Sequence, residues 1–225
     1  MNFDAPMTGR ESARPPLWFV PLLVAAMAGC SSAYYGAMEK VGYHKRDILV
    51  SRVESAMTSQ EEAKEEFKDA YERFASVVSV PASELERTYR DLSRAFERAE
   101  SSADEVRERI ESVASVSEAL FDEWRDEIEQ IGDRGLRSAS ARQLRESQAR
   151  YGELMRAMQR AEKRMDPVLA TFRDYVLFLK HNLNARAIAS LQGELAGVEA
   201  DVGTLIRDME TSIGQARDFI ASMDP

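Results

Sequence analysis

The sequence predicts an all-α protein whose long helices pack antiparallel in a bundle, with heptad contacts like those of a coiled coil. Residues 43–131 contain no glycine, and residues 31–222 contain only two prolines. Little therefore interrupts helix formation. Apolar residues also recur at alternating steps of three and four. This spacing averages 3.5 residues, the period that keeps one face of a helix against a partner.

The first apolar stripe predicts a helix over residues 34–79. We place its end before Pro81, because the residue that precedes a proline avoids the α-helical region. The stripe consists of Leu49, Val53, Ala56, Gln60, Ala63, Phe67, Ala70, Phe74 and Val77.

The second stripe predicts a helix over residues 82–131. Ser83 and Glu86 have the spacing of a capping box at its start, and Gly132-Asp133-Arg134-Gly135 has the composition of a turn at its end. The stripe consists of Leu85, Tyr89, Leu92, Phe96, Ala99, Ala103, Val106, Ile110, Val113, Ser117, Leu120, Trp124, Ile128 and Ile131.

Two further stripes predict helices over residues 136–181 and 184–223. The stripe of the third helix stays in phase through Pro167, which indicates a kink rather than an end. Between the third and fourth helices the heptad phase slips, and Asn182 and Asn184 lie at the slip. Asparagine tolerates the left-handed conformation and also caps helix starts.

Four helices of similar length joined by short turns indicate an up-down-up-down antiparallel bundle. At about 1.5 Å per residue each helix is roughly 60–75 Å long. The alternative is three helices, in which the last two form one long, bent helix that packs on a hairpin.

The N-terminus reads as a lipoprotein signal peptide over residues 1–29, followed by a single elongated domain over residues 30–225. Leu17 to Gly29 form an apolar run too short to span a bilayer as a helix. The run ends in Ala28-Gly29-Cys30, which resembles the lipobox that directs lipid attachment to a cysteine, and Cys30 is the only cysteine. The residue after the cysteine is Ser31 rather than aspartate. This resembles the pattern of lipoproteins that are sorted to the outer membrane and face the periplasm. Met27 departs from the leucine that is usual at its position.

The residues do not suggest catalysis, a cofactor or a metal site. His44 and His181 are the only histidines, and neither has a glutamate three positions earlier, as helical di-iron proteins require. No metal-binding cysteine pair or phosphate-binding loop occurs. The net charge of −9 disfavours nucleic acid as a partner. We therefore expect a protein that is not an enzyme, with membrane lipid and another envelope protein as its partners.

Three groups of residues are candidate sites, each weighed against a plain structural role. Basic residues near the anchor could contact anionic head groups, although a solvated helix face explains them as well. At the opposite end, helix faces are apolar on both sides, as in a partner-docking tip or in ordinary core. Gln60 and Glu162 interrupt two stripes at one predicted height, which suggests a buried polar layer that fixes register, although Glu162 could instead point outward. The basic end comprises Lys40, Lys45, Arg46, Arg134 and Arg137, with Arg142 and Arg145 nearby, and the tip comprises Val78, Val80, Leu177 and Phe178.

Two segments, YYGAMEKVGYHKRDILV at residues 34–50 and FLKHNLNA at residues 178–185, resemble domain-of-unknown-function family 2959, a family of bacterial lipoproteins. The resemblance covers about residues 30–223 and implies an envelope protein with no assigned activity. We expect a membrane-anchored periplasmic rod that spaces or binds other envelope components. The alternatives are a membrane-active helical protein and an accessory subunit of an envelope complex.

Overall fold

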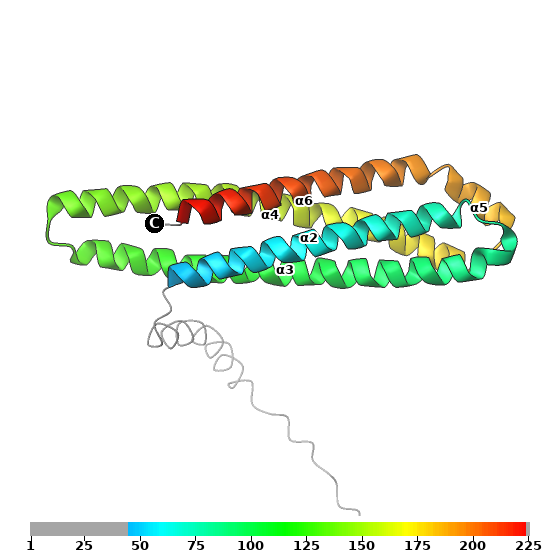
Figure 1. Cartoon of the computed structure of the whole chain (residues 1–225), viewed down its shortest axis with the longest axis horizontal. Coiled ribbons are helices and arrows are strands. Elements are labelled where there is room, and N and C mark those ends of the chain that lie inside the picture. Colours follow the sequence, from blue (N-terminus) through cyan, green and yellow to red (C-terminus); the bar gives the residue numbers. More distant parts are fainter. Residues whose placement is uncertain (1–44, 224–225) are drawn as a thin grey trace, which may run out of the picture. The chain divides into compact units, whose positions relative to one another are not determined.

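The computed structural model describes residues 45–223, all of which belong to one compact helical unit (Figure 1). Four long helices build this unit, and the described residues include no β-strand. The expected all-α bundle is thus confirmed. The four helices are α2 (Lys45–Val77), α3 (Leu85–Gln130), α4 (Arg134–His181) and α6 (Leu195–Met223), accompanied by the short helices η2 (Ala82–Glu84) and α5 (Ala185–Gln192).

The long helices form a closed ring. Helix α2 packs against α3, α3 against α4, α4 against α6, and α6 returns to α2. Each long helix therefore has two neighbours along most of its length, and each apolar stripe meets the stripes of the adjacent helices. The predicted start of the first helix at residue 34 lies outside the described residues.

Three ion pairs between helices match this ring. They join Arg98 of α3 to Glu66 of α2 at 2.8 Å, Arg173 of α4 to Glu100 of α3 at 2.5 Å, and Arg164 of α4 to Asp208 of α6 at 3.3 Å. The six side chains are between 29% and 55% exposed to water, so each pair adds at most about 1 kcal/mol to stability. The ion pairs are consistent with a single alignment of the neighbouring helices along their length. The stability of the bundle comes mainly from its apolar core.

The first turn of the bundle differs from its prediction. Helix α2 ends at Val77, before Pro81 as expected. The three residues after Pro81 form the 3-10 helix η2, in which the Glu84 amide donates to the Pro81 carbonyl at 3.0 Å. Helix α3 therefore begins at Leu85, and no side chain caps it. The predicted capping box at Ser83 and Glu86 is absent because the 3-10 turn moves Ser83 out of the capping position.

The predicted break near Asn184 is present, so the long bent helix is not the arrangement found. The Asn184 side chain accepts hydrogen bonds from the amides of Arg186 and Ala187, both at 3.1 Å. A further, unexpected break separates α5 from α6 at Gly193 and Glu194. The predicted fourth helix is thus divided in two.

Helix α4 continues through Pro167, as its unbroken stripe predicted. Pro167 is exposed, so its ring faces solvent rather than the core. None of the described helices combines the length and apolar character needed to cross a membrane.

Candidate interaction surfaces

The helical unit presents two ends, and the described candidate residues lie at these ends, apart from Gln60 and Glu162 in the middle of α2 and α4. At one end α3 and α4 extend past the first residue of α2 and the last residue of α6 (Figure 1). We call residues 120–130 of α3 and 134–150 of α4 the hairpin overhang. The remaining candidates, Cys30 and Lys40, lie outside the described residues.

Local hydrogen bonds hold the hairpin overhang together. The Trp124 indole donates to the Ser140 hydroxyl at 2.9 Å and so joins the two helices. The Asp133 side chain accepts from the Leu136 amide at 2.8 Å and caps the start of α4. The Arg137 guanidinium donates to the Ile131 carbonyl at 2.9 and 2.6 Å, which satisfies a carbonyl at the end of α3. The turn is therefore built by side chains that the sequence supplies locally.

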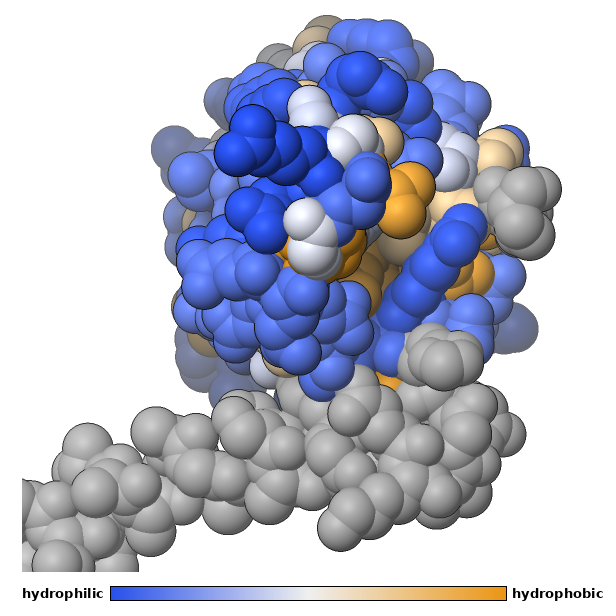
Figure 2. Space-filling model, turned by 90° about the vertical axis from the view of Figure 1, so that its left-hand side faces the viewer, coloured by the Kyte–Doolittle hydropathy of each residue, from blue (hydrophilic) through white to orange (hydrophobic). Residues whose placement is uncertain are grey.

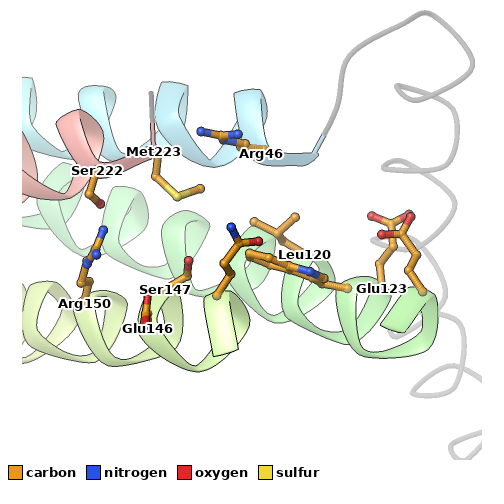
Figure 3. Close-up of a pocket in the computed structure, with 11 residues that line it drawn as sticks. Arg46, Leu120, Glu123, Glu146, Ser147, Arg150, Ser222 and Met223 are labelled. Carbon is orange, nitrogen blue, oxygen red and sulfur yellow. The ribbon is translucent and has the colours of Figure 1, made fainter. Parts of the chain in front are cut away.

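A hollow of about 440 Å³ lies where the hairpin overhang leaves the four-helix part of the bundle. Arg46 and Met223 lie across this hollow from Ser147 and Arg150 (Figure 3). Viewed from this end, apolar atoms are visible at the centre of a hydrophilic surround (Figure 2). Its lining residues are Arg46, Leu120, Glu123, Trp124, Glu127, Gln143, Glu146, Ser147, Arg150, Ser222 and Met223.

The predicted basic residues share this end with carboxylates. Lys45 pairs with Glu123 at 2.8 Å, and the guanidinium of Arg137 is engaged at the turn. Arg134 and Arg46 are exposed. The charge of this end is consequently mixed rather than uniformly positive.

At the opposite end, Leu177 and Phe178 of α4 are the exposed members of the predicted docking tip. They are 54% and 40% exposed. Val80 is half-buried, whereas Val78 is only 3% exposed and belongs to the core. Gln192 of α5 donates to the Val78 carbonyl at 3.0 Å, so α5 holds the end of α2 in place. Val78 therefore cannot contribute to a docking surface, because its side chain is covered.

Aromatic contacts stiffen both halves of the core. Phe74 stacks on Tyr175 with ring centroids 4.7 Å apart, and Phe121 meets Tyr151 edge-on at 5.4 Å. Burial raises the pKa of both tyrosines above its ordinary value, because a buried phenolate is poorly solvated. These tyrosines therefore stay protonated and serve packing.

The polar layer in the core differs in composition from its prediction. Gln60 is fully buried, and neither atom of its amide has a hydrogen-bond partner, so it makes no direct hydrogen bond to Glu162. Glu162 is only half-buried. Ser212 of α6 is fully buried, and its hydroxyl is likewise unpartnered. Ser212 was not expected in this layer because serine is not an apolar residue, although the step of three from Met209 places it on the buried face of α6.

Within residues 45–223, no cluster of three or more His, Cys, Asp or Glu side chains is arranged to hold a metal ion. In the comparisons with known proteins, residues 34–223 match the family described as protein of unknown function (DUF2959). Neither a curated protein nor a solved structure matched the chain.

Proposed function

The chain belongs to the DUF2959 family, and from that premise we propose that it is a lipid-anchored interaction protein of the bacterial envelope. The anchor is the acylated Cys30, and the helical bundle presents binding surfaces at its ends. The proposed location is the periplasmic side of the outer membrane. The observation that carries the proposal is the position of the chain's only cysteine, directly after an apolar run that ends in Ala28 and Gly29.

The chemistry of the bundle is consistent with binding rather than turnover. Its core is apolar, and the hollow at the hairpin overhang is lined by carboxylates, arginines and apolar side chains, without a nucleophile beside a histidine base. The exposed Leu177 and Phe178 offer apolar surface at the other end. Two separated surfaces on one long scaffold suit a protein that spaces or joins other components.

The test of the anchor is the variant Cys30→Ala. We expect it to lose lipid labelling and to leave the membrane fraction, or to accumulate uncleaved, because lipid is added to a thiol and the cut follows that addition. Metabolic labelling with a fatty-acid analogue and membrane fractionation measure the two effects. Ser32→Ala is the matched control and should behave like the natural chain. Cys30→Ala protein that is cleaved and fractionates normally would contradict the anchor.

A further inference from the structure

The first part of α4 is basic, although the chain as a whole is acidic. Residues 134–164 contain nine lysines and arginines and three glutamates, whereas the net charge of the chain is −9. Five of these cations are exposed and follow one another along a single side of the helix. We call them the basic stripe, which consists of Arg142, Arg145, Arg156, Arg160 and Lys163.

The basic stripe faces away from the core. At about 100° per residue, its members lie within roughly 60° of one another around the helix axis. Met158 and Met165, which are fully buried, lie on the opposite side of α4. Because α4 packs against α3 and α6, the stripe follows the outer edge of the bundle, diagonally opposite α2. It is roughly 32 Å long at about 1.5 Å per residue.

The cations of the stripe have no partner within the protein. Among residues 45–223, no ion pair joins a member of the basic stripe to a carboxylate. On α3, by contrast, six of the seven arginines form ion pairs. The sequence explains part of the difference, because Arg145 and Arg160 have no acidic residue three or four positions away. The charge of the stripe is therefore left for solvent or for a ligand.

The stripe also brings like charges together. Arg142 and Arg145 are three positions apart, and Arg160 lies four positions after Arg156 and three before Lys163. Side chains at these spacings are neighbours on a helix surface, and like charges there destabilise the helix. These cations thus lower helix stability and contribute nothing to the core, which points to an anionic ligand.

The residues between the cations favour a lipid surface as that ligand. The other outward positions of this stretch are Ala149, Gly152, Glu153 and Gln159, so large apolar and aromatic side chains are lacking here. A protein partner needs an apolar centre to its interface, and a single-stranded nucleic acid needs aromatic side chains on which its bases stack. The net charge of −9 also repels nucleic acid. An anionic membrane surface requires only cations that lie close to it.

We propose that the basic stripe binds the surface of an anionic membrane, so that the bundle lies along this membrane on its α4 edge. The guanidinium groups pair with lipid phosphates. The inference rests on the proposed function in one respect: the lipid anchor keeps the bundle beside the membrane, which makes a weak electrostatic contact effective. The surface differs from the predicted basic end, where Lys45 and Arg137 are engaged within the protein.

The experiment places a fluorescent label at one of two positions and measures which of them approaches a membrane. Ala149→Cys puts the label in the middle of the basic stripe, and Thr58→Cys puts it at an exposed position of α2. The full-length chain is reconstituted with vesicles that carry a quencher on their head groups. The vesicles consist of phosphatidylcholine, or of equal parts phosphatidylcholine and phosphatidylglycerol.

We expect the label at position 149 to be quenched more strongly on the anionic vesicles than on the neutral ones. The label at position 58 should be quenched equally on both, because α2 lies across the ring from α4. Raising the salt concentration should remove the difference at position 149, since salt screens charges that are exposed to solvent.

The triple variant Arg145→Gln, Arg156→Gln and Arg160→Gln tests the stripe itself. Each cation near an anionic surface contributes roughly fivefold to binding, so the variant should shift the equilibrium from the membrane-bound to the free orientation by on the order of a hundredfold. The extra quenching at position 149 should then be lost. Circular dichroism checks that the variant stays helical.

The matched control removes three exposed cations elsewhere, on α3, α5 and α6, through Arg87→Gln, Arg186→Gln and Arg217→Gln. It should keep the quenching of the natural chain. Equal loss in both triple variants would reduce the effect to general charge attraction and overturn the proposal. Equal quenching at position 149 on neutral and anionic vesicles, or stronger quenching at position 58, would overturn it too. An acidic peptide that displaces the label from anionic vesicles would assign the stripe to a protein partner instead.

The result is separable from the anchor. Mass spectrometry of the natural chain shows whether Cys30 carries lipid, and if it does not, the labels are placed in a Cys30→Ser chain. A chain without lipid that still lies on α4 at anionic vesicles would keep the stripe and lose the lipoprotein role. A lipidated chain whose label at position 149 ignores the lipid charge would do the reverse.

Discussion

At the scale of single residues, the unusual feature is a pair of polar side chains buried without hydrogen bonds. Gln60 lies in the stripe of α2 and Ser212 in that of α6, and both are fully buried. A buried amide without partners costs about 1–3 kcal/mol relative to its hydrated state. Polar residues in a heptad core are known to fix register at the expense of stability, which gives a physical reason for their presence here.

The variant Gln60→Leu should therefore stabilise the protein. We expect the free energy of unfolding to rise by about 1–3 kcal/mol, because leucine fills a similar volume and has no amide to desolvate. Urea denaturation followed by circular dichroism measures the change. Gln159→Leu, at an exposed position of α4, is the control and should shift stability by less than about 0.5 kcal/mol. A less stable Gln60→Leu chain would mean that the amide is satisfied in solution.

At the scale of elements, α4 illustrates how a strong stripe outweighs a local breaker. A proline inside a helix removes one backbone hydrogen bond and costs about 3 kcal/mol relative to alanine. Helix α4 nevertheless runs from Arg134 to His181, because Met165 and Phe172, on either side of Pro167, are both fully buried against neighbouring helices. Tertiary packing offsets the local cost.

We expect Pro167→Ala to raise the free energy of unfolding by about 1–3 kcal/mol. The exposed position of Pro167 means that the change should remove no packing. Thermal and urea unfolding of the two chains give the difference. Ala170→Pro, which places a proline at another exposed site of α4, should destabilise by about 3 kcal/mol. If Pro167→Ala has no effect, the helix would have to be already interrupted there in solution.

At the scale of the whole molecule, the defining feature is that the last helix returns to the first. The pKa of Lys64 is raised above its ordinary value, chiefly by its hydrogen bond to Glu61 and also by the carboxylate of Glu210 on α6. The charge of Glu210 therefore acts on Lys64 across the α2–α6 contact, although the two residues lie far apart in the sequence. This contact closes the ring of four helices.

Cross-linking tests ring closure. In a Cys30→Ser background, we expect Lys64→Cys with Glu210→Cys to be joined by a short bis-maleimide in most chains. Lys64→Cys with Lys180→Cys should not be joined, because Lys180 lies at the far end of α4. Mass spectrometry of digested protein identifies the linked peptides. Efficient linkage in the control pair and none in the first would exclude the ring.

The sequence by itself determined the helical class, the long helices and most of their boundaries, because these depend on local chemistry. Apolar spacing defines a buried face, Pro81 ends a segment, and Asp133 and Asn184 cap the helices that follow. The division between α5 and α6 at Gly193 was missed, because one glycine in an in-phase stripe is a weak signal.

Only the tertiary structure decided which stripes meet. In the structure α6 packs against α2. Gln60 and Ser212 are both buried in the core without hydrogen-bond partners, and Val78 is buried rather than exposed. The structure also placed Leu120 and Trp124, which the sequence presents as ordinary members of a stripe, in the lining of a hollow. Heptad spacing predicts that one face of a helix is buried, but it does not predict which other helix buries it. Whether a residue is core or surface depends on the lengths of the other helices beside it.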